Sequence, residues 1–300
     1  MIWEILEEIP MESLFLTWDS LQLKMRLFVV CALLVFSFPF IITEVVDSFS
    51  KCSEFFLEGK PPVIPGILKD SVSQDNNRYK LICQRYKNAY RFATVYDTTN
   101  KIPVFSAYRY TGFKKGRPHI RWMIEPQLET SGVQMSVRHV NQAYTEDYRK
   151  WSRLDRGHLF PNGHAANKDI AESTFTLTNV VPQYKSFNGG SWSRMENDVR
   201  DIMESDCPKN RPAYVLTGAV ANQEHYLNQK VNVPTHMWNA FCCYNDKTNA
   251  WVSRAHWAEN KDESEDKKKK IPEKTLKELL QFLEEKYKSE VTLFNKCLDN

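Results

Sequence analysis

The hydrophobic pattern changes its period several times along the 300-residue chain, and these changes restrict the folds that it can adopt. Residues 92–96 and 104–110 are strand-like runs on either side of a turn-rich segment, which predicts a β-hairpin. Further strands are predicted at residues 175–181, 213–220, 241–245 and 250–257. Helical spacing occurs from residue 188 to about 203 and again around residues 276–287. Antiparallel strands combined with a few helices indicate an α+β domain.

The composition indicates one folded domain. With 42% hydrophobic and 26% charged residues, the chain can bury a core, which excludes extended disorder. The sequence has no internal repeat at solenoid or propeller spacing. Residues 125–150 are predicted to form a loop with one short helix. Residues 261–300 are predicted to comprise a solvated charged linker, residues 261–270, and a C-terminal helix.

The first 50 residues contain a candidate export signal. An apolar run at residues 27–42 follows Lys24 and Arg26 and precedes a more polar segment, which is the order of a signal peptide. The run is shorter than the roughly 20 residues that a bilayer-spanning helix needs. We therefore expect a signal peptide at residues 25–50, cleaved before Lys51, and a secreted protein without a stable membrane span. The alternative is an uncleaved signal-anchor that tethers the protein to a membrane.

Residues 1–24 are acidic, which opposes the positive start of a signal peptide. Translation from Met25 would omit them, so we expect an N-terminal extension that the secreted form lacks. After residue 50 the chain contains 38 lysines and arginines against 30 acidic residues. This basic body allows an anionic partner without identifying one.

The cysteines indicate an oxidising compartment. Six of them follow residue 50, an even number that predicts three disulfides in a secreted chain. The adjacent Cys242 and Cys243 are expected to bond two different partners, since a bridge between neighbours strains the peptide. The remaining pairing stays open. A zinc site is the competing reading, but the sequence lacks two C-x-x-C pairs at zinc-finger spacing.

Residues that suit phosphodiester hydrolysis lie between 155 and 196. The tetrapeptide at residues 155–158 is D-R-G-H, and Asn188 and Glu196 follow it. The reaction needs a base for water, a cation that offsets negative charge and a group that holds the phosphate. His158 can take a proton near neutral pH, and Arg156 can bind a phosphate through two hydrogen bonds. The oxygens of Asn188 and Glu196 suit the hard cation Mg²⁺.

A family resemblance rests on these residues and their neighbours. Residues 174–183, TFTLTNVVPQ, followed by Asn188, Trp192 and Glu196, resemble the second half of the DNA/RNA non-specific endonuclease signature. Together with D-R-G-H they are similar to the ββα-metal nuclease pattern, at the spacing of the family. The similarity covers about residues 80–260. The subgroup that the chain most resembles is the secreted endonuclease domain-containing 1 proteins, through residues 51–56, 82–85, 91–94 and 242–243.

The resemblance implies a ββα-metal (His-Me finger) nuclease fold with a central antiparallel sheet and flanking helices. The endonuclease domain would occupy residues 51–260. The implied activity is that of a metal-dependent hydrolase that cuts the phosphodiester bonds of DNA and RNA without sequence preference. Its cofactor would be one Mg²⁺ ion, for which Mn²⁺ can substitute. The oligomeric state stays open.

Position by position, the resemblance assigns roles to individual residues. His158 would be the general base that deprotonates the attacking water. Asn188 would be the one direct protein ligand of Mg²⁺, and Glu196 would contact the ion through water. Asn179 would brace His158 or its loop, and Asp155 would support the site.

Substrate contacts are where the chain departs from its family. Arg156 would steady the phosphate or the leaving side. Relatives also carry an arginine in the hairpin turn that contacts phosphate, whereas residues 98–101 here are T-T-N-K. Lys101 would supply a charge there without the bidentate geometry of arginine. This departure keeps open a second hypothesis, a secreted nucleic-acid-binding or interaction protein with little or no activity. A phosphodiesterase of the same fold that acts on smaller substrates is the third.

Structural roles compete with these assignments. His164 and His236 are expected to be structural. Trp192 and Met195 have the spacing of core-facing helical residues. Asn188 can also cap the helix that begins there, because asparagine is a favoured N-cap residue.

Overall fold

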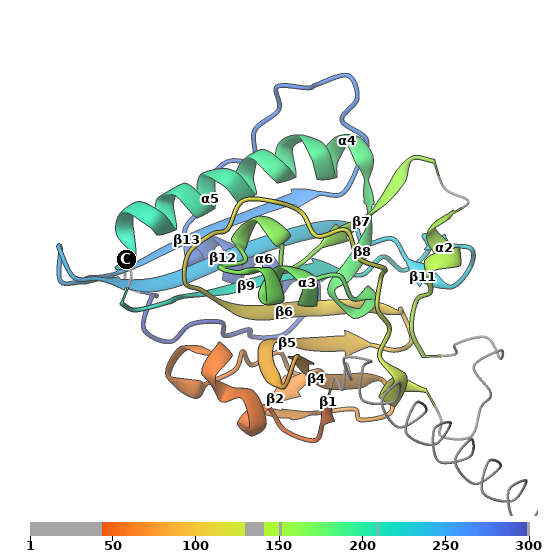
Figure 1. The fold of residues 1–300 in the computed structure, drawn as a ribbon, viewed down its shortest axis with the longest axis horizontal. Coiled ribbons are helices and arrows are strands. Elements are labelled where there is room, and N and C mark those ends of the chain that lie inside the picture. The colour runs from red at the N-terminus through yellow and green to blue at the C-terminus, as the bar shows by residue number, and fades with distance from the viewer. Residues whose placement is uncertain (1–43, 130–140, 150–151, 209, 299–300) are drawn as a thin grey trace, which may run out of the picture. The chain divides into compact units, whose positions relative to one another are not determined.

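The structure is a computed structural model that describes residues 44–129, 141–149, 152–208 and 210–298. Its main feature is a seven-stranded antiparallel sheet (Figure 1). Its strands, in spatial order, are β1 (Glu44–Val46), β4 (Tyr79–Tyr86), β5 (Ala89–Asp97), β6 (Ile102–Tyr110), β9 (Ala213–Val220), β12 (His236–Asn245) and β13 (Ala250–Glu259). The predicted hairpin is confirmed as β5 and β6. The strands predicted at 213–220, 241–245 and 250–257 are confirmed as β9, β12 and β13. The prediction of an α+β domain is therefore confirmed.

Smaller elements connect these strands. The two-stranded ribbons are β2 (Leu68–Lys69) with β3 (Val72–Ser73), β7 (Leu154–His158) with β8 (Val180–Tyr184), and β10 (Tyr226–Leu227) with β11 (Val231–Asn232). The α-helices of the described residues are α2 (Thr145–Arg149), α3 (Lys168–Ser173), α4 (Lys185–Phe187), α5 (Ser193–Asp206) and α6 (Leu276–Tyr287). The 3₁₀ turns are η1 (Phe49–Phe55), η2 (Leu57–Gly59), η3 (Pro126–Leu128), η4 (Asn162–His164) and η5 (Leu177–Asn179). A π-helical turn, η6 (Asn188–Trp192), links α4 to α5.

A hydrophobic core lies on each face of the main sheet. Strand β12 contributes to both, because alternate side chains of a strand point to opposite faces. Trp238 and Ala240 lie in the core that also contains the buried side of α6. Met237 and Phe241 lie in the core that contains the buried side of α5. Figure 1 accordingly shows α5 along the near face of the sheet and α6 behind it.

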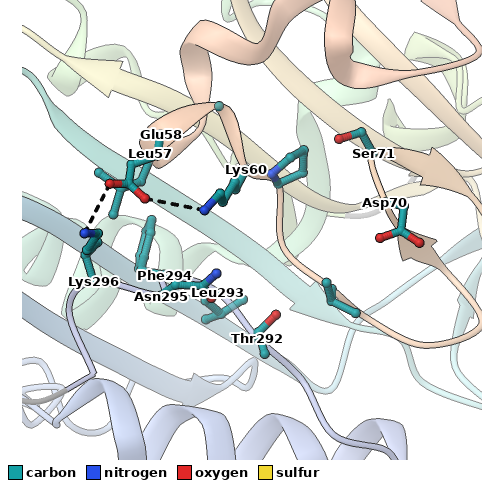
Figure 2. A pocket seen from close by; sticks show the side chains of 13 residues that line it. Leu57, Glu58, Lys60, Asp70, Ser71, Thr292, Leu293, Phe294, Asn295 and Lys296 are labelled. Carbon is teal, nitrogen blue, oxygen red and sulfur yellow. Dashed lines mark ion pairs between the residues drawn. The ribbon is translucent and has the colours of Figure 1, made fainter.

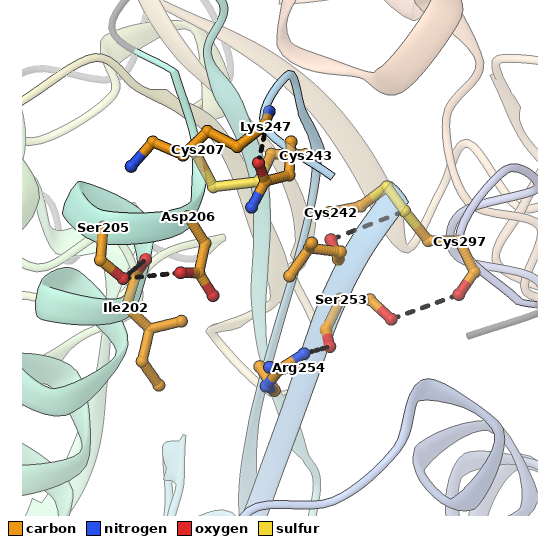
Figure 3. The surroundings of a disulfide bond; sticks show 12 residues. Ile202, Ser205, Asp206, Cys207, Cys242, Cys243, Lys247, Ser253, Arg254 and Cys297 are labelled. Carbon is orange, nitrogen blue, oxygen red and sulfur yellow. Dashed lines mark hydrogen bonds between the residues drawn. A yellow bond between two sulfur atoms is a disulfide. The ribbon is translucent and has the colours of Figure 1, made fainter. Parts of the chain in front are cut away.

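The same alternation explains the two adjacent cysteines of β12. Cys243 bonds Cys207, which directly follows α5, and Cys242 bonds Cys297 in the C-terminal segment (Figure 3). A third disulfide joins Cys52 to Cys83. Both predictions are confirmed, that of three disulfides and that of different partners for the adjacent pair. Each face of β12 is thereby tethered to a separate covering segment.

The ββα segment of the fold consists of β7, β8 and the helical run from α4 to α5. Gly157 in β7 lies opposite Val181, and the side chain of Gln183 crosses the ribbon beside it. A Cβ atom at residue 157 would lie 1.9 Å from the Gln183 Oε1 atom, so this position excludes any side chain. The glycine between Arg156 and His158 is therefore required by the close approach of β8.

Two sequence predictions differ from the structure in this segment. The strand expected at 175–181 begins only at Val180, because Leu177–Asn179 forms a 3₁₀ turn. The buried hydroxyls of Thr176 and Thr178 both contact the Glu125 carboxylate and lie 3.2 Å apart, which is closer than the roughly 6.6 Å that separates residues i and i+2 along a strand. The helix expected to end near residue 203 continues to Asp206, and its first turn is π-helical.

The N-terminal boundary of the folded domain lies before residue 51. Strand β1 pairs with β4, the Glu44 carboxylate contacts Lys51 and Tyr90, and Phe49 is fully buried. A cut before Lys51 would remove this edge strand and a core aromatic residue, so the expected cleavage point conflicts with the fold. The expected signal peptide itself and residues 1–24 lie outside the described residues.

The C-terminal region contains the predicted helix α6, which begins with a capping box between Thr275 and Glu278. The preceding charged run is mostly exposed, with the exception of Glu263, which is buried and pairs with Lys269 at 2.7 Å. In the loop expected at 125–150, the described residues form η3 and α2. None of the described helices is long and apolar enough to cross a membrane.

Candidate active site

One pocket brings together most of the residues that the sequence predicts for the site. It has a volume of about 400 Å³ and lies between β7, the turns after it and the start of α5. The predicted residues that line it are Asp155, Arg156, His158, Asn188 and Glu196. Residues that the sequence reasoning did not assign to the site also line it, among them Arg117, Trp122, Asn197 and Arg200. Asn179 and Lys101 do not line this pocket.

His158 ends β7 and is almost completely buried, with an exposed fraction of 9%. Its ring packs edge-on against Phe175, with 5.0 Å between the ring centroids. Burial, reinforced by the positive charges of Arg117 and Arg156, lowers the pKa of His158 to about 3. The imidazole is therefore neutral at physiological pH. Its Nε2 atom is buried and has no hydrogen-bonding partner among the described residues. A neutral ring in this state can accept a proton.

Asn188 and Glu196 are brought to the same pocket by the helical run after β8. Asn188 opens the π-helical turn, and Glu196 lies in the first turn of α5. Both side chains are half-buried. The N-cap residue of α5 is Trp192, so Asn188 does not cap this helix. Burial raises the pKa of the Glu196 carboxyl to about 8, since the charged form loses hydration.

These two donors fit a hydrated hard cation. Amide and carboxylate oxygens are ligands that Mg²⁺ accepts, and this ion commonly keeps several waters. The described residues contain no group of three or more His, Cys, Asp and Glu side chains that could hold a metal. A cation beside Glu196 would offset the cost of burying its negative charge. The donor set therefore fits a magnesium ion that the protein holds through few direct ligands.

Asn179 lies beneath the loop that follows His158. Its Oδ1 atom accepts hydrogen bonds from the Phe160 amide at 3.0 Å and the Ser106 hydroxyl at 2.9 Å. Its Nδ2 atom donates to the carbonyls of Phe160, at 3.1 Å, and Thr174, at 3.0 Å. The side chain is fully buried, and it links β6 to the backbone two residues beyond His158. The geometry supports bracing of the loop, without contact to the His158 ring.

His164 has the bonding pattern of a structural residue. Its Nε2 atom lies 2.8 Å from the main-chain carbonyl oxygen of Glu196, and its Nδ1 atom lies 2.8 Å from the Tyr108 hydroxyl. Since a carbonyl only accepts, Nε2 donates, and Nδ1 accepts from the tyrosine. With both nitrogens occupied, this ring ties α5 to β6. His236 begins β12 and contacts the ring of Phe282, outside the pocket.

Arg156 is held by aromatic rings. Its guanidinium carbon lies 4.7 Å from the ring centroid of Trp122 and 5.8 Å from that of Tyr148. No carboxylate of the described residues forms a salt bridge with it. Stacking leaves its N–H donors available for a phosphate, because cation–π contact uses the flat face of the group.

Two further arginines that line the pocket were missed in the sequence. Arg117 comes from the irregular segment between β6 and η3, and its guanidinium carbon lies 5.1 Å from the centroid of the Phe175 ring. Arg200, one turn beyond Glu196 on α5, donates to Asn197 and Asp201. The only sequence signal for Arg117 is the basic and aromatic composition of residues 113–122, which has no secondary-structure period.

Lys101 lies at the turn of the β5–β6 hairpin, away from the residues above. Its charged neighbours are Lys230, Asp147 and Glu129. Burial lowers the pKa of Lys101, and the positive charge of Lys230 lowers it further. Asn100, beside it, is buried and hydrogen-bonded to Asp97. Lys101, which was expected to replace the family arginine, is therefore a turn residue that does not line the pocket.

A different pocket lies between η2 and the C-terminal segment and has a volume of about 220 Å³ (Figure 2). Its one charged cluster is Glu58 between Lys60 and Lys296, at 3.7 and 3.5 Å. These charges satisfy each other, and the lining lacks a histidine. This pocket therefore lacks the base that the pocket at β7 and α5 contains.

The ββα segment, with a histidine at the end of its first strand and an asparagine before its helix, defines a ββα-metal nuclease fold. Residues 74–299 match the family model described as DNA/RNA non-specific endonuclease. The chain belongs to this family of hydrolases, as the sequence resemblance predicted.

Relatives in sequence agree with this family. The human endonuclease domain-containing 1 protein is 32% identical over 216 residues, which cover 68% of this chain and 41% of that protein. The salivary endonuclease of Lutzomyia longipalpis is 26% identical over 174 residues, covering 50% of this chain and 41% of that protein. The chain thus matches less than half the length of either relative.

The fold also agrees with a solved structure. The crystal structure of the EndoG/EndoGI complex contains a chain that matches with a TM-score of 0.50 at 19% identity. The match covers 70% of this chain and 84% of the other. At this identity the likeness concerns the fold alone.

Proposed function

We propose that this protein is a secreted, Mg²⁺-dependent endonuclease that hydrolyses phosphodiester bonds of DNA and RNA without sequence preference. Family membership supports a nuclease, and the pocket supports the chemistry. The observation that carries the proposal is the neutral, buried His158 in the same pocket as Asn188, Glu196 and Arg156, which forms no salt bridge with a described residue. A base, oxygen donors for a cation and a phosphate-binding group are thus combined in one pocket.

In this mechanism His158 takes the proton from a water molecule that attacks the phosphorus atom. The bond between phosphorus and the leaving oxygen breaks, and solvent water protonates that oxygen. The unpartnered Nε2 atom supports this role, because the ring is unprotonated at neutral pH and this nitrogen forms no other hydrogen bond with the described residues. Arg156 and Arg117 hold the non-bridging oxygens and offset the charge that grows on them in the transition state. Asn179 keeps the loop after His158 in place, and His164 keeps α5 in register with the sheet.

Asn188 would hold the magnesium ion directly, and Glu196 would hold it through water. When bound, the ion supplies Lewis-acid stabilisation of charge on the phosphate and leaving oxygen. Mn²⁺, with similar oxygen preference, is expected to substitute.

Secretion is supported by the apolar run at residues 27–42 and by the three disulfides, which persist in oxidising compartments. Because β1 and Phe49 belong to the folded domain, we place signal cleavage before Glu44 rather than before Lys51.

Plasmid nicking by the purified secreted protein tests the proposal. We expect cutting in millimolar Mg²⁺, loss of cutting in EDTA, and cleavage of both duplex DNA and RNA. Folded protein that binds DNA without cutting it in Mg²⁺ or Mn²⁺ would instead support the nucleic-acid-binding hypothesis. Cutting of small diesters alone would support the phosphodiesterase hypothesis.

A further inference from the structure

A second pocket adjoins the catalytic one. It has a volume of about 670 Å³, and it shares Arg156 and Trp122 with the catalytic pocket. We call it the flanking pocket, and its other lining residues used below are Arg121, Tyr144, Glu146 and Arg149. Because Arg156 and Trp122 line both pockets, a ligand at the first can extend into the second without leaving the protein surface.

The charges of the flanking pocket favour an anion. Three guanidinium groups, those of Arg121, Arg149 and Arg156, line it against one carboxylate, that of Glu146. Glu146 lies 3.5 Å from Arg149 on the same short helix, with 52% of its side chain exposed. Exposed pairs of this kind contribute little stability, so a phosphate can replace the carboxylate as the partner of Arg149. Arg121 forms no salt bridge within the described residues.

The aromatic side chains of the pocket suit a planar base. Tyr144 is 38% exposed at the start of α2, and Trp122 lies between the two pockets with Arg156 over its ring. Arginines that hold a phosphate backbone, combined with an exposed aromatic ring for base stacking, are the usual elements of a single-strand binding surface. The volume lies in the range of pockets that hold small organic ligands.

We infer that the flanking pocket binds the nucleotide next to the scissile phosphate, with its base on Tyr144 and its outer phosphate between Arg121 and Arg149. This inference rests on the proposed function, and it assigns the strand a path from the catalytic pocket across Arg156. It predicts that substrates long enough to fill both pockets are preferred over a minimal diester.

The first experiment compares two substrates of the full secreted protein. A single-stranded 20-mer fills both pockets, and bis(p-nitrophenyl) phosphate represents the catalytic pocket alone. We expect the ratio of the two kcat/KM values to fall about tenfold or more in the double variant Arg121→Ala/Arg149→Ala and in Tyr144→Ala. Tyr144→Phe should keep the ratio, because stacking needs the ring only. Glu146→Gln should raise it. Arg109→Ala, a matched loss of an exposed arginine on β6, should leave it unchanged.

Salt dependence separates phosphate contacts from general damage. Loss of the outer phosphate contact in the double arginine variant should reduce the slope of log affinity against log salt by about 0.7 for a single strand, and Tyr144→Ala should leave the slope unchanged. A ratio and slope equal to those of the parent in the double arginine variant would overturn the inference.

Binding in EDTA keeps the inference separate from the proposed function. If the parent cuts neither substrate, the proposed function fails, yet the affinity for a labelled 20-mer still reports on the flanking pocket. Weaker binding by the double variant, but not by Arg109→Ala, would support the inference in that case. Equal binding by the parent and the double variant would refute it.

Discussion

The indole ring of Trp122 lies against the imidazole of His158, with 5.2 Å between the ring centroids and 42° between the planes. The same indole carries the guanidinium group of Arg156. One side chain from an irregular segment therefore contacts two residues of the D-R-G-H motif. It excludes water from one side of His158, which contributes to the depressed pKa of that ring.

Replacement of the proposed base tests the chemical step. His158→Ala should lower kcat by roughly 10²–10⁴-fold, because general-base catalysis is lost. DNA affinity in EDTA should change little, since the arginines remain. The measurement is plasmid or oligonucleotide cleavage at saturating substrate.

His164→Ala is the matched control for His158→Ala. It removes the link between α5 and β6, so it should lower the melting temperature more than His158→Ala while reducing kcat less. If folded His158→Ala cuts as fast as the parent, or if His164→Ala alone is inactive at full stability, the assignment of the base is wrong.

Asn188→Ala should abolish magnesium-dependent cleavage, because the proposed direct ligand is lost. Asn188→Asp restores an oxygen donor and should recover part of the rate at a lower Mg²⁺ concentration, since a carboxylate binds the ion more tightly. Titration of the rate with Mg²⁺ measures both effects. Tight stoichiometric zinc in the purified parent would contradict the assignment of a weakly held hard cation.

Arg117 and Lys101 differ in their position relative to the pocket, and their variants should differ accordingly. Arg117→Ala should reduce kcat/KM by about 10-fold or more, because a charge-assisted hydrogen bond to phosphate is lost. Lys101→Ala should reduce it by less than 2-fold. Steady-state kinetics of both variants on one oligonucleotide measures the two losses. A larger loss of kcat/KM in Lys101→Ala would show that Lys101 contacts the phosphate, as the sequence predicted.

His256 should make stability depend on pH. It is buried in β13, its Nδ1 atom has no partner among the described residues, and burial lowers its pKa to about 4. The unfolded chain, with a histidine pKa near 6.5, then binds the proton first as pH falls, so stability decreases below about pH 6.5. Between pH 7 and 5 this group should cost the parent about 2 kcal/mol of unfolding free energy.

Urea unfolding of the parent and of His256→Gln at both pH values measures this term. The parent should lose about 2 kcal/mol more than the variant on acidification. Parallel stability curves would show that His256 is not a buried neutral group.

The position of the N-terminus tests the domain boundary. N-terminal sequencing of secreted protein should give a start before Glu44. Deletion of residues 44–50 should lower stability substantially, because β1 and the buried Phe49 are lost together. A stable, active product that begins at Lys51 would contradict this boundary.

Local sequence determined much of the fold. The hairpin of β5 and β6 and the helix α6 were predictable because alternation and helical spacing both place apolar side chains on one buried face. The different partners of Cys242 and Cys243 follow from strand geometry in the same way. The motif residues His158, Asn188 and Glu196 were also identifiable, since their chemical types and spacing are a property of one continuous ββα segment.

Tertiary structure alone decided the remainder. Arg117 and Trp122 lie in a segment without a hydrophobic period, and only the packing of that segment against β7 and Phe175 brings them to His158. Lys101 occupies the turn where the family has its arginine, but its neighbour Asn100 is buried and Lys101 does not line the catalytic pocket. Residues 175–179 alternate like a strand, but the buried Glu125 carboxylate binds two of their hydroxyls and favours a 3₁₀ turn. Hydrogen bonds and burial between distant segments carry no local period, and for this reason the sequence by itself could not reveal them.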